Sequence, residues 1–155
     1  MILVDTRLKK REDSGNILKV GMIGSGEMAK GMINQIINHT EGMTVACTYG
    51  RNASKVKDVF ESLGLTKYVL TNDLDAAEDA IAQGLCVITD DIDTLCKLSS
   101  IEVLVESTGA IEFAAETILK AFKNKKHVLS FNAELDSTLG PILYKKAKEY
   151  GVKYA

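Results

Sequence analysis

The feature that most constrains the fold is an alternation of short apolar runs with segments of helical periodicity along nearly the whole chain. Buried strands are expected at residues 18–23, 43–49, 85–89, 103–106 and 128–131, where apolar residues are contiguous. Between these runs apolar residues recur every three to four positions, as in amphipathic helices. Strands that alternate with helices predict βαβ units. We therefore expect an α/β protein with a doubly wound, mainly parallel sheet and helices on both faces.

The same pattern predicts six helices between and after the strands, at residues 27–39, 54–63, 74–83, 92–98, 111–122 and 139–150. Pro141 would then fall in the first turn of the last helix, where proline is tolerated. Residues 68–70 are ambiguous, and residues 152–155 are expected to begin a further strand. We expect residues 5–13 to form a charged helix outside the sheet.

Composition excludes several functional classes. The formal net charge of −2 over 155 residues gives no basic field for nucleic acid or for a membrane surface. No apolar run approaches the roughly 20 residues of a membrane span, and the charged N-terminus lacks the apolar stretch of a signal peptide. These features predict a cytoplasmic protein. Cys47, Cys86 and Cys96 form no CxxC pair and are expected to be small buried residues.

A glycine-rich turn carries the functional signal. The sequence Gly24-Ser25-Gly26-Glu27-Met28-Ala29 matches GxGxx(G/A) between a predicted strand and a predicted helix. Gly24 permits a tight turn, and Gly26 lets the backbone approach a diphosphate. The helix N-terminus then offers free N–H groups to the phosphates. The pattern predicts a Rossmann-type NAD(P)-binding domain over residues 17–155, preceded by a charged, helical lead over residues 1–16.

The end of the second strand bears on the choice between NAD and NADP. An acid there would accept hydrogen bonds from the ribose 2′-hydroxyl and repel a 2′-phosphate. The sequence instead reads Tyr49-Gly50-Arg51-Asn52. Arg51 and Asn52 are the predicted cofactor-binding residues here. Arg51 could pair with the 2′-phosphate, although a solvated arginine before a helix is the alternative, and Asn52 or Ser54 could cap that helix. We expect NADP to be preferred over NAD.

Two later strand ends are expected to border the nicotinamide, because ligands in this fold lie at the carboxyl ends of the strands. Glu106, Glu134 and Asp136 are the acids nearest this edge. Glu134 and Asp136 are the candidate catalytic residues, with a helix cap or a solvated carboxylate as the alternative. No metal-ligand spacing is present. The predicted nicotinamide-side residues are Ser107, Thr108, Gly109, Asn132 and Ala133.

The chain resembles the N-terminal domain of the homoserine-dehydrogenase-like oxidoreductases that carry a C-terminal SAF domain. Some members of that family are 1-deoxy-D-xylulose 5-phosphate reductoisomerase-like enzymes. The resemblance rests on residues 20–26, 105–109 and 126–128, and most specifically on residues 132–136 followed by 140–143. It implies NAD(P)-dependent hydride transfer in a cytosolic enzyme. Two positions depart from the family's pattern. Gly50 stands where members of the family often have an acidic residue before the arginine. Glu134 stands close to the position where homoserine dehydrogenases usually have a lysine after the asparagine of the fifth strand.

The main hypothesis is therefore the cofactor domain of an oxidoreductase that transfers hydride to or from a small carbonyl or alcohol substrate. Because the family's chains are longer, we expect the catalytic region to lie outside this chain, which alone would bind cofactor without turnover. A homo-oligomer is possible. The alternatives are a non-catalytic dinucleotide-binding or sensing module, and a domain whose site is completed by a partner subunit.

Overall fold

The computed structural model describes residues 2–155, so Met1 of the predicted N-terminal lead lies outside the described residues. Six parallel strands form one sheet in the order β3-β4-β2-β1-β5-β6. This arrangement confirms the predicted doubly wound α/β fold. The strands are β1 (Leu18–Ile23), β2 (Met43–Tyr49), β3 (Tyr68–Leu70), β4 (Cys86–Thr89), β5 (Val103–Glu106) and β6 (His127–Ser130).

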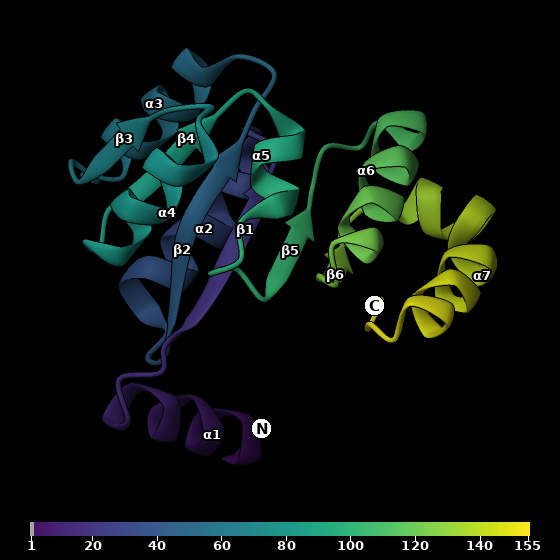
Figure 1. Cartoon of the computed structure of the whole chain (residues 1–155), viewed down its shortest axis with the longest axis horizontal. Coiled ribbons are helices and arrows are strands. Elements are labelled where there is room, and N and C mark those ends of the chain that lie inside the picture. The colour runs from purple at the N-terminus through teal and green to yellow at the C-terminus, as the bar shows by residue number, and fades with distance from the viewer. Residues whose placement is uncertain (1) are drawn as a thin grey trace.

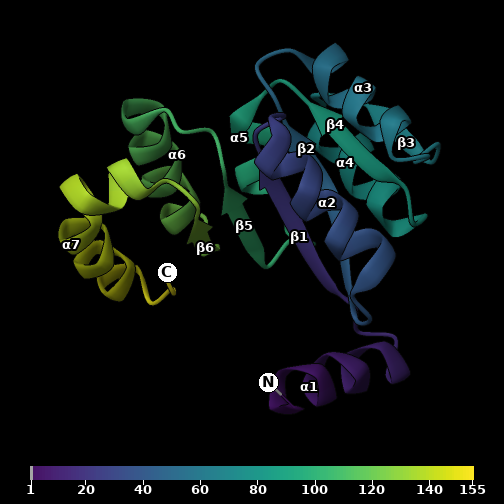
Figure 2. The ribbon, with the colours of Figure 1, turned by 180° about the vertical axis from the view of Figure 1, so that it is seen from behind.

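Helices cover both faces of this sheet (Figures 1 and 2). On one face α2 and α3 pack through Ile33 and Phe60 against β1, β2, β4 and β5. On the other face α4, α5, α6 and α7 pack through residues such as Leu95 and Phe122 against the same strands and β6. The helices are α1 (Ile2–Asp13), α2 (Glu27–His39), α3 (Ala53–Ser62), α4 (Leu74–Ala82), α5 (Ile92–Lys97), α6 (Ile111–Lys123) and α7 (Ala133–Tyr150).

Helix α1 lies outside the two layers, below the amino ends of the strands (Figure 1). Arg11 holds it there, because its guanidinium pairs with Glu102 and its Nε donates to the Asn16 carbonyl at 2.8 Å. Glu12 accepts a hydrogen bond from the Gly42 amide at 2.6 Å. Among the described residues, no helix is long and apolar enough to cross a membrane.

The last helix differs from its prediction. It starts at Ala133 rather than at Leu139, because the Asn132 side chain caps it by accepting from the Leu135 amide at 3.0 Å. Pro141 is therefore inside the helix and not in its first turn, contrary to the sequence prediction. An interior proline removes one helical hydrogen bond and bends the axis, and α7 changes direction along its length (Figure 2).

The two ambiguous segments also take defined places. Residues 68–70 form the edge strand β3, which pairs with β4. Tyr154 forms one parallel bridge with Val128 of β6, so residues 152–155 reach the sheet without forming a full strand.

Side chains cap most of the helices. Asn52, Asp73, Asp91 and Asn132 cap α3, α4, α5 and α7, whereas α2 and α6 begin at Gly26 and Ala110 without a side-chain cap. A side-chain cap satisfies N–H groups that otherwise have no partner within the helix. The first turns of α2 and α6 therefore keep N–H groups that no side-chain cap satisfies.

The cap of α5 gives a pH-dependent stability prediction. Hydrogen bonds, first from the Thr94 hydroxyl and then from the Asp93 and Thr94 amides, hold the pKa of Asp91 below its ordinary value. A depressed carboxyl pKa stabilises the fold above about pH 4 and ceases to do so as pH falls through the folded pKa. We expect Asp91→Ala to lower the free energy of unfolding by about 1 kcal/mol at neutral pH. The deficit should shrink below about pH 4.

Urea unfolding at pH 7 and pH 3 measures this difference. Asp79→Ala, which removes an exposed carboxylate from the interior of α4, is the control. An Asp91→Ala deficit that is equal at both pH values would contradict the prediction.

Candidate functional site

The parallel register brings four strand ends to one edge of the sheet. Ile23 at the end of β1 aligns with Tyr49 of β2 and with Glu106 of β5, and Glu106 aligns with Ser130 of β6. The chain runs from β1 outward through β2, and it crosses to the other side of β1 between β4 and β5. The switch point of the topology is therefore between β1 and β5, where ligands bind in open α/β sheets.

Gly24 and Ser107 meet at this switch point. The Ser107 amide and hydroxyl both donate to the Ile23 carbonyl at 3.0 Å. Gly24 has a φ of +127°, and a Cβ atom added to it would lie 2.9 Å from the Ser107 Oγ. Only glycine combines this backbone conformation with so close an approach. The contact fixes where the chain turns from β1 into α2.

Gly26 lies in open space at the start of α2. No described atom comes within 4 Å of a Cβ added there, and the residue is exposed. Glu27 and Met28 are also exposed, and Ser25 is half-buried. No side chain of the described residues caps this helix. The first N–H groups of α2 are consequently available to an anion.

The end of β2 lies beside this turn. A Cβ added to Gly50 would lie 2.5 Å from Val56 Cγ2 and 3.5 Å from the Ser25 Oγ, so the packing leaves no room there for an acidic side chain. Arg51 is exposed and makes no ion pair with a described residue. The Asn52 side chain caps α3 by accepting from the Ser54 amide at 3.0 Å.

The sequence reasoning missed the end of β4, which pairs with β2 at this edge. Gly50 donates its N–H to the Thr89 carbonyl at 3.1 Å, so Asp90 follows immediately beside Gly50 and Arg51. Asn72 joins this group, because it accepts from the Thr89 hydroxyl at 2.7 Å and donates to Asp90 at 2.6 Å. The strand order that places β4 next to β2 is the missing signal, and the sequence pattern does not contain it.

The β5 end is organised around Glu106. Its side chain is completely buried, and Oε1 accepts from the Thr108 amide at 2.6 Å and from the Thr108 hydroxyl at 2.5 Å. The Thr108 hydroxyl also accepts from the Ala110 amide at 3.3 Å. Gly109, with a φ of +68°, is exposed at the tip of the loop. Glu106 therefore anchors the loop after β5 through its two hydrogen bonds from Thr108.

The β6 end presents Asn132. This side chain is 2% exposed, and its Nδ2 has no hydrogen-bond partner among the described residues, while Oδ1 caps α7. A buried amide donor without a partner is unfavourable unless a ligand or a water molecule accepts from it. Ala133 and Glu134 follow on the first, exposed turn of α7. Asp136 is also exposed, and its Oδ1 accepts from the Tyr154 hydroxyl at 3.4 Å.

The cysteines take no part in this edge. Cys47 and Cys96 are buried, as predicted, whereas Cys86 is only half-buried. Burial raises the pKa of the Cys86 thiol to about 11 and that of Cys96 to about 12. All three thiols therefore stay protonated and unreactive near neutral pH.

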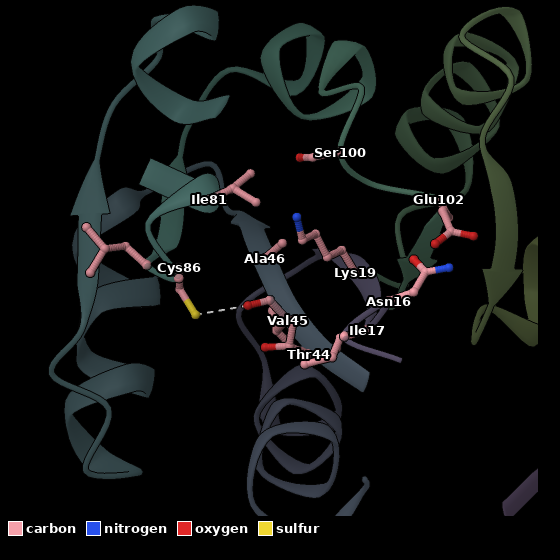
Figure 3. Close-up of a pocket in the computed structure, with 13 residues that line it drawn as sticks. Asn16, Ile17, Lys19, Thr44, Val45, Ala46, Ile81, Cys86, Ser100 and Glu102 are labelled. Carbon is pink, nitrogen blue, oxygen red and sulfur yellow. Dashed lines mark hydrogen bonds between the residues drawn. The ribbon is translucent and has the colours of Figure 1, made fainter. Parts of the chain in front are cut away.

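A separate hollow lies at the opposite edge of the sheet (Figure 3). It has a volume of about 420 Å³ and is lined by Asn16 and Lys19, by the start of β2 and by Cys86 and Ser100. The Cys86 thiol donates to the Val45 carbonyl across its wall at 2.9 Å. Because the strands begin here, the hollow is a strand length away from the glycine turn.

The switch point, the open glycine turn and the uncapped start of α2 define a NAD(P)-binding domain of the Rossmann type. Comparison with known proteins identifies the family of this domain. It belongs to the family described as the homoserine dehydrogenase NAD-binding domain, whose model matches residues 24–155. A homoserine dehydrogenase from Synechocystis is 28% identical over 142 residues. This match covers 87% of the chain but only 28% of the relative, so the chain spans less than a third of that enzyme.

Solved structures agree on the fold. A homoserine dehydrogenase from Thiobacillus denitrificans superposes with a TM-score of 0.63 at 23% identity, covering 89% of this chain and 28% of that one. A myo-inositol dehydrogenase from Lactobacillus casei, solved with NAD(H) and myo-inositol, gives 0.62 at 18% identity, covering 90% and 36%. At these identities the likeness establishes the Rossmann architecture alone.

The Gly24 contact predicts a loss of stability on substitution. Gly24→Ala should lower the free energy of unfolding by about 1–3 kcal/mol, because alanine is strained at this φ and its methyl group would crowd Ser107. Gly26→Ala, in open space at an ordinary φ, should cost less than about 1 kcal/mol. Chemical denaturation of both variants measures the difference, and equal costs would contradict the contact-based explanation.

Proposed function

We propose that this chain holds a nicotinamide dinucleotide across the carboxyl edge of its sheet, as the cofactor domain of an oxidoreductase. In the longer protein, hydride would pass between the nicotinamide and a small carbonyl or alcohol substrate, by analogy with homoserine dehydrogenase. The observation that carries the proposal is the open turn at Gly24 and Gly26, which leads into a helix without a side-chain cap. Membership of an NAD-binding family supports it independently.

The residues at this edge fit the parts of such a cofactor. The diphosphate would lie on the turn from Gly24 to Met28, where the backbone N–H groups and the helix dipole favour negative charge. The nicotinamide would lie toward the ends of β5 and β6, near Ser107, Thr108, Gly109 and Ala133. The unpartnered Nδ2 of Asn132 would donate to the carboxamide or to a substrate oxygen. When bound, the cofactor supplies hydride chemistry, and the protein supplies position and electrostatics.

We propose NADP as the preferred cofactor. The packing of Gly50 against Val56 keeps an acidic side chain off position 50, and the Arg51 guanidinium beside it, which pairs with no acid among the described residues, can bind a phosphate. Asn52, which caps α3, would contribute through its backbone. Asp90 would border the same ribose from β4.

Several sequence expectations stay predictions at this point. These are a C-terminal SAF domain in the longer protein, a cytosolic location, a homo-oligomer, and substrate contacts mainly outside the chain. Glu134 and Asp136 remain the candidate catalytic acids, placed on the exposed first turn of α7. Their position beside Asn132 supports a role near the substrate rather than at the diphosphate.

A substitution at Gly26 tests the proposal by separating stability from binding. Gly26→Asp should preserve or raise thermal stability, because aspartate is a favoured N-cap and suits the helix dipole. It should lower affinity for NADPH and NADH at least about tenfold, because its carboxylate would repel the diphosphate. Gly26→Asn, a neutral cap of similar size, is the matched control and should lose less affinity.

Calorimetric titration with each dinucleotide, together with thermal unfolding, provides both readouts. Failure of the unmodified chain to bind either dinucleotide at millimolar concentration would overturn the proposed function. Equal binding by the aspartate and asparagine variants would show that the diphosphate does not lie on this turn.

The NADP preference has its own test. Arg51→Asp should lower NADPH affinity by about tenfold or more and leave NADH affinity within about threefold, which reverses the preference. Lys55→Asp, the same charge change on the exposed surface of α3, should leave the ratio of the two affinities nearly unchanged. An unchanged ratio in Arg51→Asp would show that Arg51 does not recognise the phosphate.

A further inference from the structure

Glu106 is a buried acid without a cationic partner. Its side chain is 0% exposed at the carboxyl end of β5, and none of the ion pairs among the described residues includes it. Buried carboxylates are ordinarily paired with a cation, because removing a charge from water is unfavourable. This residue lies one position before the loop that is expected to border the nicotinamide.

Donors from the loop after β5 and from the end of β6 surround the Glu106 carboxyl group. The Thr108 amide and hydroxyl both donate to Oε1, at 2.6 Å and 2.5 Å. The Thr108 hydroxyl can serve as a donor here because it already accepts from the Ala110 amide. On the other side of the carboxylate, Ser130 donates to Oε2 over a long 3.5 Å. One carboxylate oxygen is thus well satisfied, and the other has a single weak partner.

The groups on the neighbouring elements do not supply a positive charge. Tyr154 lies beside this acid, and its pKa is raised chiefly by burial, with further increases from the charges of Asp136 and Glu106. Asp136 accepts a hydrogen bond from the same phenol. The side chains that contact the Glu106 carboxyl group among the described residues therefore carry hydroxyl groups, and none of them is a cation.

We propose that Glu106 makes the site discriminate between the two redox forms of the cofactor, in favour of the oxidised form. This inference rests on the proposed function. The oxidised nicotinamide ring carries one positive charge, and it becomes neutral when its C4 atom accepts a hydride from the substrate. A fixed negative charge at the β5 end stabilises the cationic ring and not the neutral one.

The direction of the reaction follows from this discrimination. Preferential stabilisation of the oxidised ring makes the bound reduced cofactor a stronger hydride donor. Glu106 would therefore bias the bound pair toward hydride transfer from cofactor to carbonyl, with the carbonyl reduced and the ring oxidised. In this role Glu106 acts on the ring through its charge and also positions Thr108 through two hydrogen bonds.

Glu106→Gln tests the inference, because glutamine keeps the shape of the side chain and its bond to the Thr108 amide but removes the charge. The quantity measured is the affinity for the oxidised dinucleotide divided by the affinity for the reduced one, by calorimetric titration with NADP⁺ and NADPH. We expect this ratio to fall about tenfold in Glu106→Gln. Glu116→Gln, the same change at an exposed position on α6, should leave it unchanged.

The outcomes separate this inference from the proposed function. An unchanged ratio in a folded Glu106→Gln variant that binds both forms would overturn the inference alone. Binding of neither form by the unmodified chain would overturn the proposed function. If Glu106→Gln does not fold, the unmodified chain decides: tighter binding of NADP⁺ than of NADPH supports the inference, and tighter binding of NADPH overturns it.

Discussion

The contact between Gly24 and Ser107 is the constraint on which the rest of this edge depends. Two hydrogen bonds from Ser107 to the Ile23 carbonyl join the ends of β1 and β5, and the glycine lets the chain turn within van der Waals distance of that serine. The turn leads into α2, which packs along one face of the sheet. The helix that follows β5, α6, begins on the other side of the same point. These two helices lack the side-chain caps present on α3, α4, α5 and α7.

The electrostatic character of the edge changes along its length. At the start of α2, free N–H groups and the helix dipole produce positive potential. Beyond the switch point lies the buried carboxyl group of Glu106, which has no cationic partner among the described residues. An oxidised dinucleotide has the complementary distribution, with negative phosphates in its middle and a positive ring at one end. The remaining polar groups of the edge mostly bond to one another or to helix N-termini, as Asn72, Thr89 and Asp91 do.

The sequence was sufficient to predict the fold class and the glycine turn, because both depend on local patterns: the period of the apolar residues and the spacing of two glycines. It was insufficient where spatial neighbours decide. Asn132 begins α7 six residues before the apolar periodicity becomes clear, so Pro141 is interior rather than at the helix start. Asp90 lies beside Gly50 and Arg51 only because β4 pairs with β2. The sequence pattern predicts that Glu106 lies near this edge of the sheet. It does not predict that Glu106 is buried beneath Thr108, because that burial depends on β5 lying between β1 and β6.

The packing of Gly50 against Val56 has a consequence for how this domain can diverge. A side chain at position 50 would collide with a methyl group of a helix that also anchors one of the two cores. An acid at position 50 would therefore need a smaller residue at position 56 or a shifted α3. The identity of residue 50 is thus coupled to the packing of α3, and an acid there would require coordinated changes in a strand end and in a helix.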